Sequence, residues 1–183
     1  MSGLKNGHAS AVHRSINVIL SFTVPVAAIL AVYSPFALKI MGPNYADGWL
    51  VLSILAISTP FICVFISIRS LVYALGNYRA VFAMGIVVGI TRVLLYFYLV
   101  PLYGSLGAAL SFDAGAIAVF FLALYYGKVS SLHFNWKGFL LAVLLPFGIG
   151  ILLWFLKISW YFGIILILSI SMFVFARTKL YTR

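Results

Sequence analysis

Six apolar runs, each long enough to cross a lipid bilayer, dominate this sequence and limit what it can fold into. A transmembrane helix needs about 20 consecutive apolar residues to span the hydrocarbon core. Hydrophobic residues make up 65% of the chain and charged residues 8%, which leaves too little polar surface to coat a soluble globule. The sequence therefore predicts an all-α fold, a polytopic membrane helix bundle with six transmembrane helices. The runs cover approximately residues 16–39, 49–75, 80–100, 105–127, 138–156 and 159–176.

The net charge of +10 comes from 12 Lys and Arg residues against only two acidic residues, Asp47 and Asp113. In a soluble domain this excess would suggest nucleic acid as a partner. Here most basic residues lie between the apolar runs, where membrane proteins carry the charges that set their orientation. No nucleic-acid partner is expected.

The basic residues also predict the orientation of the chain. If the chain crosses the membrane six times, the side that holds the N-terminus carries eight of them, whereas the opposite side carries Lys39 and Lys157. Cytoplasmic loops carry the excess of Lys and Arg, so both termini are expected in the cytoplasm of a multi-pass protein in the cytoplasmic membrane. The eight residues are Lys5, Arg14, Arg79, Lys128, Lys137, Arg177, Lys179 and Arg183.

The chain is expected to divide into four parts along its length. The parts are a cytoplasmic N-terminal segment at 1–14, a four-helix part at 15–127, a cytoplasmic loop at 128–137, and two additional C-terminal helices with a basic tail at 138–183.

Pro25 and Pro35 lie inside the first apolar run. They predict kinks in this helix rather than a break, because neighbouring helices can satisfy the carbonyls that the prolines leave free.

Arg92 is an ionisable residue inside the third apolar run, which a bilayer accepts only when the fold gives it a role. Gly85 and Gly89 have the four-residue spacing that lets two helix backbones approach closely. Arg92 follows Gly85 by seven residues, so it falls on the same stripe of the helix. This stripe is expected to face protein rather than lipid.

Asp113 lies in the fourth run between Ala109 and Ala116, on a second stripe of small residues that is expected to face inward. The turn between the two runs centres near Tyr103, which places Arg92 and Asp113 at nearly the same depth in the membrane. Two interpretations remain open: a buried ion pair that fixes helix packing, or a polar element beside a transport path.

Arg69 is the third candidate for a substrate contact or a structural ion pair. It lies near the inner end of the second run, where its guanidinium can also simply reach the headgroup region.

The residue types needed for catalysis or metal binding are absent from the usual patterns. Two acidic residues in different parts of the chain cannot supply paired carboxylates, and no nucleophile motif or phosphate-binding glycine loop occurs. Cys63 is the only cysteine, and His133 has no second ligand at metal-binding spacing. The chain is therefore expected to be no enzyme and to need neither metal nor cofactor.

Four short motifs follow one another in an order that is typical of one family of exporters. They are Met-Gly-Pro-Asn-Tyr-Ala at 41–46, Ala-Leu-Gly-Asn-Tyr-Arg at 74–79, Leu-Val-Pro-Leu-Tyr-Gly at 99–104 and Gly-Ala-Ala at 107–109. In order and spacing they resemble the C-terminal region of polysaccharide (Wzx-type) flippases of the multidrug/oligosaccharidyl-lipid/polysaccharide exporter superfamily.

The resemblance implies the architecture and activity of a larger protein. Members of that family typically have 14 helices in two lobes, and these six resemble the last six, with residues 15–127 as the four-helix part of the C-terminal lobe. The N-terminal lobe would come from the same or a separate chain. The whole protein would flip a polyprenyl-pyrophosphate-linked oligosaccharide across the cytoplasmic membrane for polysaccharide or glycoprotein biosynthesis, with membrane lipid and lipid-linked glycan as partners.

Two alternatives remain beside that resemblance. One is a cation-coupled drug extruder of the same superfamily, and the other is a six-helix membrane structural or assembly subunit that transports nothing. Arg92 departs from the polar, often amide, residue that the family tends to carry in this helix, so it has no role by resemblance and is a candidate on physical grounds alone.

Overall fold

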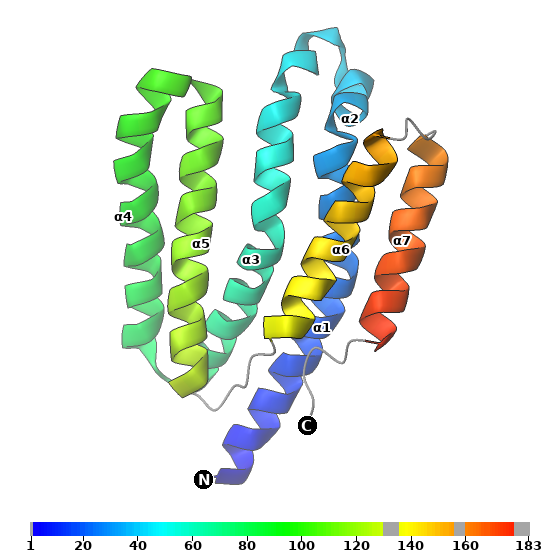
Figure 1. Ribbon diagram of the computed structural model, residues 1–183. Coiled ribbons are helices and arrows are strands. Elements are labelled where there is room, and N and C mark those ends of the chain that lie inside the picture. The colour runs from blue at the N-terminus through cyan, green and yellow to red at the C-terminus, as the bar shows by residue number, and fades with distance from the viewer. Residues whose placement is uncertain (1, 130–135, 156–159, 178–183) are drawn as a thin grey trace.

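The computed structural model describes residues 2–129, 136–155 and 160–177, and every regular element in these ranges is helical (Figure 1). Four helices are long and apolar enough to cross a membrane, and α6 and α7 contain shorter apolar stretches at Gly138–Leu153 and Phe162–Phe173. The prediction of an all-α polytopic membrane bundle is confirmed. The elements are α1 (Ser2–Val32), α2 (Ser34–Met41), the 3₁₀ helix η1 (Pro43–Gly48), α3 (Trp49–Ala74), α4 (Tyr78–Tyr103), α5 (Ser105–Val129), α6 (Trp136–Phe155) and α7 (Trp160–Arg177).

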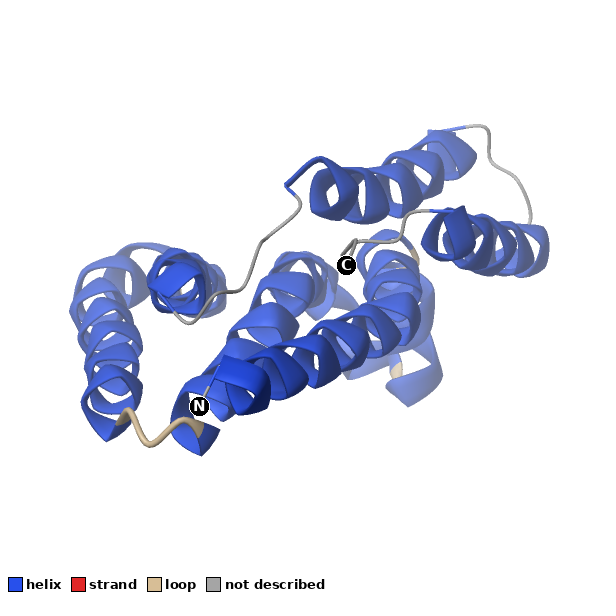
Figure 2. Cartoon of the chain, turned by 90° about the horizontal axis from the view of Figure 1, so that it is seen from below, coloured by secondary structure: helices blue, strands red, loops and turns tan. Residues whose placement is uncertain are grey.

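The long helices pack in a sequence of neighbours with α4 at one edge. α4 packs on α5, α5 on α3, and α3 on α1, while α6 and α7 cover the other side of α1 (Figures 1 and 2). α4 touches α3 only weakly compared with its contact to α5. The α4–α5 hairpin is therefore attached to the bundle mainly through α5.

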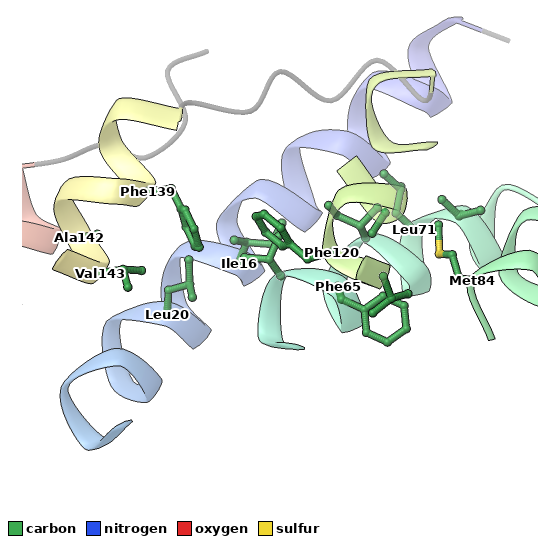
Figure 3. Packing of buried hydrophobic residues seen from close by; sticks show 14 of the residues in the cluster. Ile16, Leu20, Phe65, Leu71, Met84, Phe120, Phe139, Ala142 and Val143 are labelled. Carbon is green, nitrogen blue, oxygen red and sulfur yellow. The ribbon is translucent and has the colours of Figure 1, made fainter. Parts of the chain in front are cut away.

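Aromatic rings join the central helices into one apolar core (Figure 3). Phe120 of α5 and Phe139 of α6 stack with ring centroids 5.5 Å apart, and Phe61 of α3 meets the Phe120 ring edge-on at 5.2 Å. Ile16 and Leu20 of α1 are each 1% exposed in the same cluster. Four helices thus share one set of contacts, which fixes the position of α5 against α3.

The first apolar run is not a single kinked helix, because it breaks at Tyr33. Pro35 lies in the first turn of α2, where it has no N–H to donate and its ring would clash with the carbonyl of Ala31. The Ser53 hydroxyl of α3 lies 2.8 Å from that carbonyl oxygen and donates to it, and Ser34 Oγ lies 2.6 Å from Ser53 Oγ. The prediction of kinks without a break is therefore wrong at Pro35, since a side chain of α3 satisfies the backbone group that the break leaves free.

The remaining boundaries agree closely with the apolar runs. The helix α1 already begins at Ser2, so the segment predicted at 1–14 continues into the first span as helix. Most of the predicted loop at 128–137, with His133, lies outside the described residues, as do the turn at Lys157 and the end of the basic tail beyond Arg177.

The predicted orientation of the α4 glycines is wrong. Gly85 and Gly89 are exposed, and a Cβ atom on either would meet nothing within 4 Å. The close approach of α4 and α5 depends instead on glycines of α5. A Cβ atom on Gly107 would overlap the backbone carbonyl of Leu99, and one on Gly115 would lie 2.5 Å from Cγ of Arg92.

Candidate functional site

Arg92 lies between α4 and α5, with its side chain directed across α5. Its aliphatic part packs over Gly115, where any larger residue would collide with it. The guanidinium carbon lies 3.8 Å from the centroid of the Phe112 ring, which is within the range of a cation–π contact. Arg92 is therefore held by its packing against Gly115 and by the face of the Phe112 ring. The prediction that Arg92 faces protein is confirmed, although Gly85 and Gly89, from which it was inferred, do not face protein among the described residues.

Asp113 lies on the neighbouring stripe of α5, which faces α3. Ala109 and Ala116 on the same stripe are 3% and 0% exposed, so the predicted inward face is confirmed. The Asp113 carboxyl lies near Ser58 of α3, a residue that is 1% exposed and whose hydroxyl donates to the Leu55 carbonyl at 3.0 Å. The carboxyl therefore lies beside α3 as well as within range of Arg92 on α4.

Arg92 and Asp113 lie at one level of the bundle, as the hairpin spacing predicts. Arg92 contacts residues 112 and 115, which flank Asp113, and the two side chains are close enough for their charges to interact. Nevertheless, within the described residues neither Nε of Arg92 nor Oδ1 of Asp113 has a hydrogen-bond partner, although both atoms are buried. Whether the residues form a structural ion pair stays a prediction.

This incomplete satisfaction has an energetic consequence. A single Arg or Asp at the centre of a membrane helix costs about 2.5–3.5 kcal/mol on insertion scales. The Phe112 ring offsets part of that cost for Arg92, and the attraction between the two opposite charges offsets a further part. The site can therefore hold two opposite charges in the membrane. Nε of Arg92 can still donate a hydrogen bond, and Oδ1 of Asp113 can still accept one.

Arg69 is not part of this cluster. It is exposed on α3, and its guanidinium carbon lies 5.5 Å from the ring centroid of Phe65 on the same helix. Since Arg69 follows Ser58 by 11 positions, the two lie about 16 Å apart along the helix axis. This location suits a guanidinium that reaches the headgroups, and a role in substrate binding or in an ion pair stays a prediction.

A lateral cavity lies beside the break between α1 and α2. Its volume is about 360 Å³, and apart from Ser53 its walls are apolar, so it suits hydrocarbon better than charged or sugar groups. The lining residues are Ala31, Val32, Pro35, Trp49, Ser53, Ile57, Phe147, Ile151 and Phe155. Among the described residues no group of three potential metal ligands occurs.

The bundle is similar in structure to a lipid II flippase. The structure described as lipid II flippase MurJ in the inward closed conformation matches with a TM-score of 0.77 and 18% sequence identity. The match covers 93% of this chain and 39% of MurJ, so the chain spans well under half the length of that protein. No family model matches the sequence, and no curated protein does.

The match with MurJ confirms that the chain has a flippase-type fold. At 18% identity this likeness concerns the fold alone. Membership of the Wzx-type family and the assignment to the last six helices of a 14-helix exporter stay predictions.

Three residues that hold the charged side chains were missed from the sequence. Gly115 and Arg92 lie at nearly equal distances from Gly104, which has a φ of 57° and ends α4. That symmetry could have identified Gly115 as the residue that faces Arg92. Ser58 and Phe112 gave no comparable signal, because serine and phenylalanine are common in membrane helices and nothing in their spacing marks them.

Proposed function

We propose that this chain is part of a transporter that flips a polyprenyl-pyrophosphate-linked oligosaccharide across the cytoplasmic membrane. The observation that carries the proposal is the likeness to lipid II flippase MurJ over 93% of these residues at a TM-score of 0.77. The order of the four exporter motifs supports the polysaccharide branch of such transporters. Transport of this kind rearranges helices and involves no covalent step, in keeping with the absence of catalytic motifs in the sequence.

In this proposal Arg92 and Asp113 fix the packing of α3, α4 and α5 rather than bind the pyrophosphate. Both side chains are directed into helix contacts, and the aliphatic part of Arg92 is packed against Gly115. A phosphate-binding arginine needs a guanidinium that is open to the ligand, so that its N–H groups can meet phosphate oxygens in pairs. The substrate groups are then bound mainly by parts of the transporter outside this chain.

We expect the 183 residues alone to leave a flippase-deletion strain without surface glycan. A polypeptide that supplies the rest of the fold, expressed together with this chain, should restore glycan display, because the chain spans only 39% of the MurJ length. The measurement is staining of surface polysaccharide together with the amount of lipid-linked glycan that accumulates inside. Full restoration by the 183 residues alone would contradict the view that they form one part of a transporter, and dye efflux without glycan display would favour a drug extruder.

Both termini are proposed to lie in the cytoplasm, which makes the turn between α2 and α3 external. We expect Asn44→Cys to react with a membrane-impermeant maleimide in intact cells, whereas Tyr78→Cys at the start of α4 should react only after the cells are opened. Both positions are exposed, and the experiment uses a Cys63→Ser background because Cys63 is the single native cysteine. The reverse labelling pattern would show that the proposed orientation is inverted.

A further inference from the structure

The lateral cavity beside the break between α1 and α2 offers water very little to bind. Besides Trp49 at its rim, Ser53 is the only lining residue with a polar side chain. The Ser53 hydroxyl already donates to the Ala31 carbonyl at 2.8 Å, and its oxygen lies 2.6 Å from that of Ser34. A buried water needs about two to four polar partners, whereas apolar cavities stay dry or take apolar ligands. Hydrocarbon is therefore the material that suits this space.

The cavity opens to the side of the bundle and has room for part of a lipid chain. Ile57 of α3 and Ile151 of α6 line it and are 49% and 52% exposed, so apolar side chains flank the opening. Its volume of about 360 Å³ compares with about 150 Å³ for an apolar cavity that binds benzene. By that comparison the space admits on the order of a dozen carbon atoms in a row. This is most of the length of an acyl chain.

Charged residues lie at the same end of the bundle as the cavity. Trp49 is the first residue of α3 and is 41% exposed, a position typical of aromatic residues at the depth of the lipid headgroups. Lys39 is exposed on α2 and follows Pro35 of the cavity wall by four residues, so both lie on one face of this helix. Asp47 is exposed on η1, which packs against α2. A headgroup with one phosphate and one ammonium therefore matches the charges here better than an anionic headgroup does.

We propose that this cavity binds one acyl chain of a zwitterionic membrane phospholipid, with the lipid phosphate at Lys39. Phosphatidylethanolamine has this chemistry. The bound chain fills a space beside the helix break that no side chain of the described residues fills. The inference does not rest on the proposed function, because it requires only that the helices cross a bilayer.

Photolabelling in vesicles tests this proposal. The purified 183-residue chain is placed in vesicles of phosphatidylethanolamine and phosphatidylglycerol, with a trace of phosphatidylethanolamine that carries a diazirine on one acyl chain. We expect the label on the peptides of α3 and α6 that contain Ile57 and Ile151, located by mass spectrometry. Phe82 and Phe97 of α4 are 70% and 80% exposed and report general contact with lipid. Label spread evenly over all four positions would overturn the proposal.

Two phenylalanine substitutions provide the matched comparison for this labelling. Ala31→Phe places a ring in the cavity and should reduce the label on residues 57 and 151 by about tenfold, which corresponds to about 1.4 kcal/mol. Ala74→Phe adds the same ring at an exposed position at the end of α3, outside the cavity, and should leave the label unchanged. Equal labelling of the two variants, each with the melting temperature of the unsubstituted chain, would contradict the proposed site.

Lys39→Gln tests the headgroup contact without a change in the core, because Lys39 is exposed. A diacylglycerol probe carries the same chains and no phosphate. We expect the phosphatidylethanolamine probe to label the unsubstituted chain about threefold more strongly than this probe, and the Lys39→Gln chain equally. Lys128→Gln removes an exposed charge at the other end of the bundle and should keep the preference (Figure 1).

Two results of the probe comparison would overturn the choice of occupant. Equal labelling of the unsubstituted chain by the two probes would show that no phosphate is bound at Lys39. Loss of the label on addition of a trace of polyprenyl phosphate would show that the cavity prefers an isoprenoid chain to an acyl chain. Neither result depends on glycan flipping, so the lipid site and the proposed function are tested separately.

Discussion

Gly107→Ala is expected to destabilise the α4–α5 hairpin by about 3 kcal/mol, the upper part of the range for overpacked positions. A Cβ atom on Gly107 would overlap the carbonyl group of Leu99 and come within 2.9 Å of the Val100 nitrogen. These are backbone atoms, which cannot move aside by a change of rotamer. The two helices must therefore separate near their connecting turn, and the melting temperature of the purified chain in detergent should fall.

Gly85→Ala provides the control for this substitution, because it adds the same methyl group to the same hairpin. Nothing lies within 4 Å of a Cβ atom there, so the main effect is the better helix propensity of alanine. We expect the free energy of unfolding to rise by about 0.5–1 kcal/mol. If both variants lost stability equally, the close contact between α4 and α5 at Gly107 would be in error.

Arg92→Ala and Asp113→Ala are each expected to lower the free energy of unfolding by about 2–3 kcal/mol, with a smaller combined loss than the sum. Each single substitution leaves the other charge buried without its opposite charge. Removal of Arg92 also loses the cation–π contact with Phe112 and opens a space over Gly115. The combined variant removes both charges, so about 1–2 kcal/mol of the loss should be recovered.

Unfolding of all four proteins under the same conditions measures this coupling. Strictly additive losses would exclude an energetic link between Arg92 and Asp113. Arg92→Lys distinguishes charge from shape, because lysine keeps the positive charge but lacks the planar group that lies over the Phe112 ring. We expect Arg92→Lys to recover only part of the stability lost in Arg92→Ala.

The charged cluster could be predicted in part because a helical hairpin has a simple geometry. Equal distances from a turn place two residues at equal depth, and Arg92 and Asp113 follow this rule. The direction of each side chain about its helix axis was harder to predict. Asp113 of α5 lies near Ser58 of α3, whereas the side chain of Arg92 crosses from α4 to Phe112 of α5, so the two side chains are not directed straight at each other.

The glycines show why sequence spacing alone was insufficient at this site. Gly85 and Gly89 have the spacing of a close helix contact, and so do Gly107, Ser111 and Gly115, which lie where α5 meets α4 in the structure. A four-residue spacing shows that two glycines share a face, but it does not show which helix that face meets.

The sequence by itself determined that the chain is a helical membrane protein, approximately where most of its apolar helices lie, and that Arg92 and Asp113 lie at one level of the α4–α5 hairpin. Hydrophobicity and helix length are local quantities, because a backbone in lipid must satisfy its own hydrogen bonds within each helix. Only the tertiary structure decided how each helix is rotated about its axis, that α1 ends at Val32 with the Ala31 carbonyl bound by Ser53, and that one face of α4 has no partner among the described residues. The helices are apolar on all sides, so the rotation of each is set by the shape of its neighbours rather than by its own pattern.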